Sequence, residues 1–382
     1  MLFDRVFNFF ASLRLTVVCL MLGIVLVFAG TIAQVDMGLY KAQNEYFRSL
    51  FVFWTPHGSS LRIPFLPGGY LVGSVLVINL VAAHFKRFTL ERSKAGIWMV
   101  HFGLITLLVG QLMTDMLAHE STLHLREGQA KNYSESDRQV ELAFVNTTDP
   151  ASDLVVVIPQ TTLMSQKEIS HPALPFTVRV KDFFLNSVVE ERPPTAVEPP
   201  AATQGAGARA VLKERPRVTD TDHRDVPSAV VELVGPQGSL GSWLASEFVD
   251  QAQSFPISNQ TWRVSLRLRR YYKSFSVQLR EFQHDVYPGT DIPKNFSSRV
   301  LVQRPATGES REVLIKMNSP LRYAGDTFYQ ASYDPDDHGS VLQVVHNPSW
   351  LTPYFSCVLV GLGLLWHFMT HLLGFTLKRK TA

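Results

Sequence analysis

Residues 94–115, KAGIWMVHFGLITLLVGQLMTD, combine an apolar run with one histidine, His101, set a short way inside it. Such a run is long enough to cross a bilayer, since a transmembrane helix needs about 20 mainly apolar residues. If the helix begins near Lys94, His101 lies roughly 10 Å along its axis, within hydrocarbon. An ionisable side chain at that depth is costly without a partner, so the pattern indicates a functional site.

Three further segments of the 382-residue chain are apolar over a similar length. We therefore predict a polytopic α-helical membrane protein with four transmembrane helices. The predicted helices cover residues 15–32, 69–85, 95–116 and 351–375. The near-neutral mean hydropathy of the whole chain hides this pattern, because it averages the four spans with an ordinary polar region.

Basic residues predict the orientation, because Lys and Arg are enriched in cytoplasmic loops. Seven of them crowd the turn between the second and third spans or follow the fourth span: Lys86, Arg87, Arg92, Lys94, Lys378, Arg379 and Lys380. We therefore expect both termini in the cytoplasm and residues 117–348 outside. These clusters account for the net charge of +3, so the charge gives no support to nucleic-acid binding.

The predicted organisation has five segments. They are the N-terminal segment with the first span (1–33), a short extracytoplasmic loop (34–68), the second and third spans (69–116), an extracytoplasmic domain (117–348), and the fourth span with a basic tail (349–382). Within the short loop, residues 44–54 are rich in aromatic side chains. This composition is typical of an interfacial amphipathic helix, which Trp54-Thr55-Pro56 would end.

The extracytoplasmic domain is predicted to be mainly antiparallel β structure, as a sandwich or an open barrel. Short β-branched or alternating runs separated by turn residues support this prediction, among them QVELAFVN, LVVVIP, AVVELVG and SVLQVVH. Residues 190–228 differ, because they are rich in Pro, Ala, Gly and charge and lack apolar periodicity. We expect a flexible insertion or linker there.

Cysteine usage excludes several kinds of site. The two cysteines, Cys19 and Cys357, both lie in predicted spans. The chain therefore has no CxxC redox centre, no cysteine zinc site and no CxxCH haem-attachment motif. Any thiol chemistry has to come from other proteins.

Other histidines are weaker candidates than His101. His84 lies at the inner end of the second span, and His367 and His371 share a helical face near the inner end of the fourth. Each could ligate a metal or haem, but an interfacial position with access to water is the favoured interpretation. His119 and His346 lie just outside the spans, and we do not expect either to be an obligate ligand.

Two interpretations of His101 itself remain open from the residues alone. The imidazole either ligates a metal or is neutral and hydrogen-bonded to a neighbouring helix. Gly96, Gly103 and Gly110 repeat every seven residues along the same span, which favours one close-packing seam.

Five stretches spread over nearly the whole chain carry a family resemblance. They are FFASLRLTVVCLMLGIVLVFAGTIAQ (9–34), KAGIWMVHFGLITLLVGQL (94–112), DVYPGTDIPKNFSSRVLVQ (285–303), KMNSPLRYAGDTFYQASYDP (316–335) and HNPSWLTPYFSCVLVGLG (346–363). Together they resemble the ResB family of cytochrome c biogenesis proteins. Ten residues match its most characteristic patches in the β domain, although turn formation explains several of them: Asp285, Tyr287, Pro288, Gly289, Asn318, Pro320, Tyr323, Tyr329, Gln330 and Tyr333.

The resemblance implies that His101 is an axial ligand of a haem b held within the bilayer, as a transported substrate or transient ligand. The opposite ligand would come from a CcsA-like subunit carrying a tryptophan-rich haem-handling motif, which the six scattered tryptophans of this chain do not form. It also implies a haem-delivering or stabilising subunit of a cytochrome c synthase (haem lyase) complex in the bacterial cytoplasmic (inner) membrane, rather than an enzyme acting alone. Apocytochrome c would be the acceptor, and thiol-reducing proteins would act indirectly.

Two other functions compete with this one. The first is a self-contained b-type haem or quinone-linked redox subunit, in which His101 pairs with His84, His367 or His371. The second is a membrane-anchored scaffold or sensor in which the β domain binds a protein and His101 is structural.

Overall fold

The computed structural model describes residues 2–56, 61–86, 91, 94–193, 195, 197–218, 223–249, 251–290 and 293–381, with the backbone alone for 293 and 377–381. The chain forms two compact units. Unit 1 comprises Met1–His119 and His346–Ala382, and unit 2 comprises Glu120–Val218 and Asp222–Val345.

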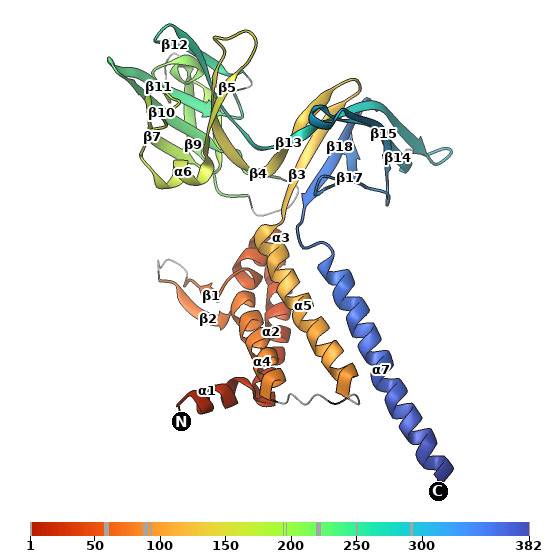
Figure 1. Ribbon diagram of the computed structural model, residues 1–382. Helices are drawn as coiled ribbons and strands as arrows, with labels where there is room; N and C mark the ends of the chain where they lie inside the picture. The colour runs from red at the N-terminus through yellow and green to blue at the C-terminus, as the bar shows by residue number, and fades with distance from the viewer. Residues whose placement is uncertain are drawn as a thin grey trace. The chain divides into compact units, whose positions relative to one another are not determined.

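Unit 1 confirms the four predicted spans as helices. Among the described residues, four helices are long and apolar enough to cross a membrane: α2 (Leu13–Met37), α4 (Gly69–Lys86), α5 (Ala95–Leu117) and α7 (Thr352–Thr381). Figure 1 shows α2, α4 and α5 grouped together, with α7 running alongside α5. The two cysteines are free thiols within α2 and α7.

The basic residues expected near the cytoplasmic helix ends are only partly described. Lys86 is the last residue of α4 and Lys94 directly precedes α5. Arg87 and Arg92 lie outside the described residues, as do the side chains of Lys378, Arg379 and Lys380.

Short elements connect the long helices. Helix α1 (Leu2–Phe10) precedes α2, and α2 is followed by α3 (Leu39–Ala42), the π-helical turn η1 (Gln43–Phe47), and strands β1 (Phe51–Trp54) and β2 (Ile63–Pro67). The helix predicted over residues 44–54 is therefore wrong for its last part. Residues 51–54 pair with β2 instead, because the aromatic and β-branched side chains of FVFW favour a strand once a partner strand is present.

One lobe of unit 2 is a β-sandwich, which is one of the two predicted alternatives, a sandwich or an open barrel. Its first sheet runs β11 (Gly238–Ser246), β10 (Ser228–Gly235), β7 (Thr177–Phe184), β6 (Glu168–Ile169). Its second combines β5 (Leu154–Pro159) and β12 (Gln253–Ile257) with parts of β4 (Ala130–Asn146) and β13 (Gln260–Val286). Helix α6 (Gln160–Ser165) follows β5. Inward-facing side chains of both sheets, such as Phe144, Val231 and Trp262, form one apolar core.

The second lobe is a nearly closed antiparallel barrel with its own core. It uses β3 (His119–Arg126), β14 (Pro293–Arg304), β15 (Glu309–Lys316), β16 (Leu321–Tyr323), β17 (Asp326–Tyr333) and β18 (Gly339–His346) together with β4 and β13. A 3-10 turn, η4 (Pro305–Thr307), joins β14 to β15. Leu125, Leu279, Phe328 and Leu342 are buried in its centre. The predicted mainly antiparallel β domain is thus confirmed, with both architectures present.

Strand β13 belongs to both lobes. Its first part pairs with β12 and β4 in the sandwich, and its last part pairs with β14 in the barrel. The register with β4 shifts between Leu268 and Arg270 and again between Tyr272 and Val277. Such irregularities bend a strand and increase its twist, which allows one strand to continue from one sheet into another.

Residues 190–228 contain more regular structure than the sequence indicated. Strands β8 (Ser187–Glu191) and β9 (Ala210–Glu214) form a hairpin, and the 3-10 turn η3 (Gly205–Arg209) precedes β9. Ala202 and Ala210 are buried against Val230 and Leu244. Small buried side chains of this kind produce no apolar periodicity, so the pattern used for prediction missed them. Residues 194, 196 and 219–222 lie outside the described residues.

Candidate functional site in the helical unit

His101 occupies the second turn of α5, and a local hydrogen bond fixes its tautomer. Its Nδ1 lies 2.8 Å from Ile97 O, one turn earlier. A carbonyl oxygen can only accept, so Nδ1 carries the proton and the lone pair is on Nε2. A histidine that donates one ring nitrogen to a backbone carbonyl presents the other as a ligand for a metal ion.

The His101 imidazole lines a cavity of about 360 Å³ between α2, α4 and α5. The lining combines apolar side chains with a few polar groups, which is the composition of small-molecule sites. The lining residues are Leu13, Thr16, Asn79, Leu80, Ala83, His84, Lys94, Ile97, Trp98 and His101.

His84 brings a second imidazole to the same cavity. Its ring centroid lies 6.1 Å from that of His101 and 3.7 Å from the ring centroid of Trp98, which it meets edge to face. Two imidazoles on opposite sides of one metal, each with a metal–nitrogen distance of about 2 Å, have centroids roughly 6 Å apart. Of the weaker candidates predicted from sequence, His84 is therefore the one that the structure brings to His101.

A buried asparagine that the sequence analysis missed holds the wall of this cavity. Asn79 is fully buried in α4; it accepts a hydrogen bond from Thr16 Oγ1 at 2.6 Å and donates to Phe10 O at 2.5 Å and Ser12 O at 3.0 Å. These bonds tie the turn between α1 and α2 to α4. The sequence does carry a signal for Asn79: it is an uncharged polar residue in the middle of the apolar run 69–85, and such residues join helices in membranes.

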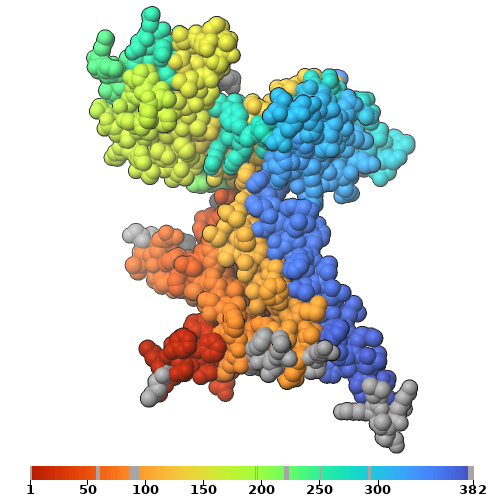
Figure 2. Space-filling view, viewed as in Figure 1, coloured from red at the N-terminus to blue at the C-terminus, as the bar shows by residue number. Residues whose placement is uncertain are grey.

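The opposite side of α5 packs against α7 through the predicted glycine seam, which is confirmed. Gly96, Gly103 and Gly110 are buried. A Cβ added at Gly96 would come within 2.5 Å of Gly363 O, and one at Gly103 within 2.7 Å of Val360 Cγ2. The space-filling view of Figure 2 shows α7 lying along α5. Backbones approach this closely only where both helices lack bulky side chains.

His367 contacts this seam, and neither His367 nor His371 lines the His101 cavity. The Cβ of His367 would lie 2.9 Å from a Cβ added at Gly96, and the two histidine rings are 4.4 Å apart. His367 Nδ1 is buried without a hydrogen-bond partner among the described residues. The structure thus separates these two candidates from His84 and His101.

Polar contacts also gather at the other ends of the helices. Tyr70 donates a hydrogen bond to Asp115, and Arg48 Nε lies 2.7 Å from Asp115 Oδ1. His119 and His346 stack with centroids 5.0 Å apart. The sequence placed this histidine pair outside the spans but gave no sign that the rings touch, because 226 residues separate them.

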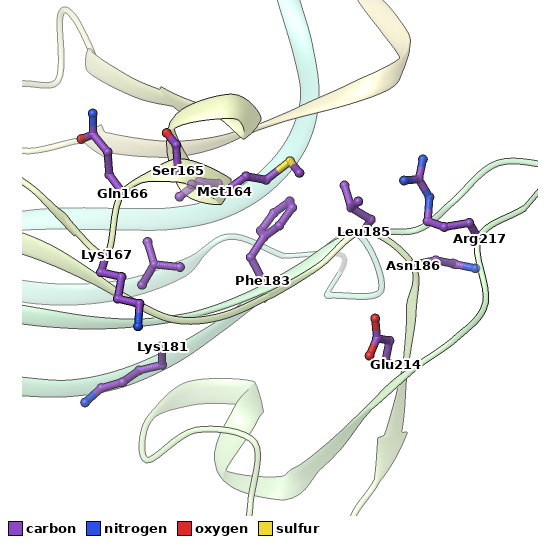
Figure 3. Close-up of a pocket in the computed structure, with 12 residues that line it drawn as sticks. Met164, Ser165, Gln166, Lys167, Lys181, Phe183, Leu185, Asn186, Glu214 and Arg217 are labelled. Carbon is purple, nitrogen blue, oxygen red and sulfur yellow. The ribbon is translucent and has the colours of Figure 1, made fainter. Parts of the chain in front are cut away.

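Unit 2 has a hollow beside β7 and α6. Its volume is about 450 Å³, and Figure 3 shows Phe183 and Leu185 together with Lys167, Lys181 and Arg217 around it. Lys181 is paired with Glu232 at 2.8 Å and Arg217 with Asp225 at 2.6 Å. These pairs give the two cations structural partners within the sandwich lobe.

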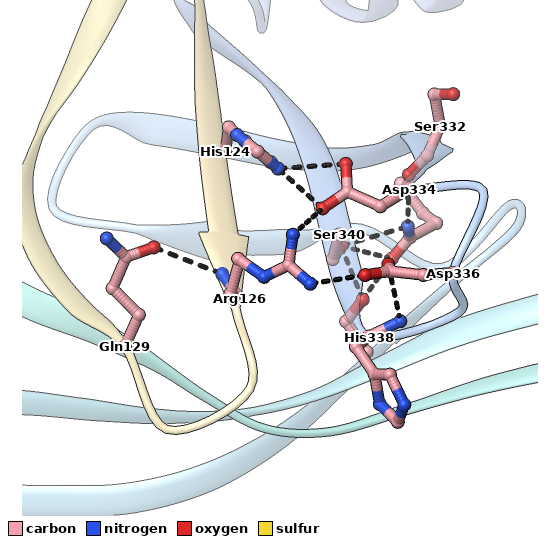
Figure 4. A network of polar contacts seen from close by, with 10 residues as sticks. His124, Arg126, Gln129, Ser332, Asp334, Asp336, His338 and Ser340 are labelled. Carbon is pink, nitrogen blue, oxygen red and sulfur yellow. Dashed lines mark hydrogen bonds and ion pairs between the residues drawn. The ribbon is translucent and has the colours of Figure 1, made fainter.

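An exposed polar network joins β3 to the turn between β17 and β18 (Figure 4). His124 Nε2 lies 2.9 Å from both carboxylate oxygens of Asp334, and Arg126 donates to Asp336. The hydrogen bond from the Arg126 guanidinium lowers the pKa of Asp336 most, and the backbone N–H of His338 lowers it further. Among the described residues, no group of three or more His, Cys, Asp or Glu side chains is placed to hold a metal ion.

Four of the ten family-matched residues of the β domain have evident structural roles. Tyr333 packs against Phe282, His284 and Phe296, and Gln330 accepts a hydrogen bond from Ser298 at 2.6 Å. Gly289 and Asn318 have φ angles of +77° and +62°, as turn residues do. The turn interpretation is confirmed for these two positions.

Comparison with known proteins finds a matching family model for part of unit 2. A model described as the ResB-like family matches residues 235–341, which run from the end of β10 into β18. Over these residues the chain is similar to the ResB-like family.

Individual proteins are similar to this chain over different lengths. Protein NrfI of Wolinella succinogenes is 25% identical over 305 residues, covering 77% of this chain and 29% of that protein. The cytochrome c biogenesis protein CcsB of Synechococcus elongatus is 31% identical over 96 residues, covering 25% of this chain and 21% of that protein. CcsB of Microcystis aeruginosa is 28% identical over 129 residues, covering 34% and 28%. The chain thus spans less than a third of the length of these relatives.

Proposed function

We propose that this chain is the haem-holding partner subunit of a membrane cytochrome c synthase, in which His101 ligates the iron within the bilayer. The observation that carries this proposal is the His101 imidazole, which lines the cavity while Ile97 O accepts its Nδ1 proton. The Nε2 lone pair is thereby available to haem iron. The printed name of the CcsB relatives, cytochrome c biogenesis protein, supports the same assignment.

The cavity suits a haem that a second subunit completes. Its volume of about 360 Å³ is near the lower end of the ~300–1,000 Å³ typical of ligand sites. A CcsA-like subunit would cover the remainder of the porphyrin and supply the opposite axial ligand. His367 and His371 lie on the α7 side of α5, so this chain would offer His84 as its only nearby alternative among the described histidines.

Lys94 would hold a haem propionate at the mouth of the cavity. It lines the same cavity as His101, and its ammonium lies 3.2 Å from Glu91, in a pair in which both side chains are about half exposed. Such exposed pairs are weak, so a propionate can compete for the lysine. A cation at the cytoplasmic end of α5 suits uptake of haem made inside the cell.

The proposed topology places both termini in the cytoplasm of a bacterial inner membrane and unit 2 outside. Haem would pass outward from His101 to the apocytochrome. There each reduced cysteine thiol adds across a vinyl group: the sulfur bonds to one vinyl carbon and the thiol hydrogen goes to the other. Thiol-reducing proteins would keep the acceptor cysteines reduced, and this chain would not complete the reaction alone.

A second candidate, the self-contained b-type haem subunit, is favoured by one observation. The His84 and His101 rings have the centroid separation of two imidazoles on one iron, within a single chain. In that case both axial ligands would come from this chain, and haem binding would not need a partner subunit.

The experiment that tests the first proposal is the visible spectrum and haem content of the chain purified with its CcsA-like partner. His101→Gly should lose haem and cytochrome c maturation, and added imidazole should restore both, because it replaces the missing ligand. His371→Gly is the matched control, since His371 lies on a membrane helix but does not line the cavity. Unchanged haem and maturation in His101→Gly would contradict the proposal and favour a structural role in a scaffold or sensor.

A further inference from the structure

The segment between α2 and α4 turns back along α2. Helix α2 ends at Met37, and Gly38 follows with a φ of +79°, which glycine adopts without strain. The turn η1 then packs against the helix, because a Cβ added at Gly30 would lie 2.8 Å from the Phe47 ring. Gly30 precedes the end of α2 by seven residues, or about 10 Å along the helix axis. The segment therefore returns to a level well inside α2.

This level is close to one edge of the hydrocarbon layer. A helix crosses the layer with about 20 residues, and α2 begins at Leu13, so residues 30–33 lie near the far edge. Gly69, the first residue of α4, is at the same level, because a Cβ added there would overlap Phe47 O. Helix α4 then crosses the layer in the opposite direction.

Polar contacts mark the same level. Arg48 Nε lies 2.7 Å from Asp115 Oδ1 near the end of α5, and Tyr70 donates a hydrogen bond to the same carboxylate. Charged groups are costly within hydrocarbon, so this cluster belongs at its edge. The hairpin of β1 and β2 starts here, since Gly68 N donates to Leu50 O at 2.8 Å. The base of the hairpin is thus fixed at the boundary between hydrocarbon and headgroups.

The hairpin itself exposes an unusual amount of apolar surface. Its strands, FVFW and IPFLP, contain no charged residue, and in the part of the chain that the structure describes no third strand pairs with them. Figure 1 shows them projecting to the side of α2 and α4. Six large side chains in or next to the strands are 38–60% exposed: Phe51, Phe53, Trp54, Leu61, Ile63 and Phe65. A two-stranded hairpin with such a surface is unstable in water.

The backbone of the hairpin excludes the centre of the bilayer as its environment. Both edges carry N–H and C=O groups without a strand partner, which hydrocarbon cannot satisfy but the hydrated headgroup layer can. Pro64 and Pro67 have no N–H, which reduces the number of such donors. The Arg62 guanidinium lies 5.1 Å from the centroid of the Phe53 ring, so an apolar face and a cation occur together.

We propose that the β1–β2 hairpin is a phospholipid-binding surface, inserted into the interfacial layer with its aromatic side chains among the acyl chains and Arg62 at the lipid phosphates. Continuity with the membrane helices identifies lipid as the occupant, because β2 leads directly into α4 at the edge of the hydrocarbon. Interfacial anchors of this kind hold membrane helices at a fixed depth and tilt. The inference requires only that the chain spans a membrane, so it does not depend on haem binding by His101.

Spin labels test this placement in the full chain. The protein carries Cys19→Ala and Cys357→Ala and is reconstituted, one copy per nanodisc, in equal amounts of phosphatidylethanolamine and phosphatidylglycerol. A nitroxide is attached to Phe65→Cys, to Ile24→Cys on the lipid-facing surface of α2, or to Leu314→Cys in unit 2, all at exposed positions. Apolar oxygen and a polar nickel chelate then compete for collisions with the label.

We expect an oxygen-to-nickel collision ratio at position 65 that is several-fold higher than at 314 and lower than at 24. A ratio equal to that at 314 would place the hairpin in water and overturn the proposal. Protection of position 65 from both reagents would show that protein covers the hairpin, which would overturn it as well. A melting temperature equal to that of the unlabelled protein shows that each labelled variant is folded.

A second measurement leaves the hairpin nearly unchanged. Trp54→Phe removes one exposed indole, and the fluorescence lost in this variant is the emission of Trp54. Lipids brominated next to the headgroup should quench this emission more than lipids brominated at the ends of the acyl chains. Absence of quenching by both lipids would contradict the proposal independently of the spin labels.

Discussion

The two faces of α5 contrast within one helix. Toward α7, glycines 96, 103 and 110 let the backbones come so close that one added methyl group would overlap the neighbour. Toward α2 and α4, His101 and Trp98 border a cavity. Both faces belong to an apolar helix, so hydrophobicity does not distinguish them. The difference lies in side-chain size: small residues close one interface, and larger polar and aromatic residues border the cavity at the other.

The largest expected effect comes from breaking the closed face. Gly96→Val should destabilise the packing of α5 on α7 by about 3 kcal/mol, because its Cβ would overlap the backbone of Gly363, which cannot move aside as a flexible side chain would. Unfolding of the purified protein in mixed detergent micelles measures this free energy. Gly73→Val is the control, since a Cβ there meets nothing within 4 Å. Equal stability of the two variants would show that the seam does not hold the helices together.

The next largest effect removes the support of the open face. Asn79→Leu should cost about 1–3 kcal/mol of unfolding free energy, because Thr16 and the Phe10 carbonyl lose a buried hydrogen-bond partner. Haem content should fall as the wall of the cavity loosens. Ile78→Leu, at a half-exposed position of the same helix, is the control. Haem loss in both variants would mean that the effect is not specific to the Asn79 bonds.

A third variant sharpens the comparison by asking what the open face contributes to ligation. With the CcsA-like partner present, His84→Gly should keep a six-coordinate haem spectrum if, as proposed, the partner supplies the ligand opposite His101. The self-contained alternative predicts a five-coordinate spectrum that added imidazole restores. The visible and magnetic circular dichroism spectra of the reduced and oxidised protein distinguish these two results.

The smallest effect concerns the mouth of the cavity. Lys94→Gln should weaken haem retention a few-fold without changing the axial-ligand spectrum, because one exposed ion pair with a propionate contributes about 1 kcal/mol or less. Competition by apomyoglobin measures retention. Lys41→Gln alters a comparable exposed pair with Glu45 away from the cavity and should have no effect. Haem with esterified propionates is the second control, because wild type and Lys94→Gln should retain it equally. Equal retention of the natural haem by these two proteins would show that Lys94 has no role.

The sequence predicted a large part of this architecture because each signal is local. Four apolar runs of helical length specified the membrane helices, and the seven-residue glycine repeat specified the closed face of α5. Alternating β-branched runs specified most of the long strands. Strands β8 and β9 were missed because the residues next to them in the sequence include many alanines and glycines and few large apolar residues. Strand β3 was missed because HESTLHLR has few apolar side chains.

By itself, then, the sequence determined the four spans, the β-rich character of residues 117–348 and the place of His101 within the third span. Only the tertiary structure decided which histidine joins it. His84 precedes His101 by 17 residues and lies on the preceding helix, whereas His367 is 266 residues away. The packing of α7 on the glycine face placed His367 behind α5 and left His84 in the cavity. The direction in which a helix face points depends on its neighbours, and no local pattern contains that information.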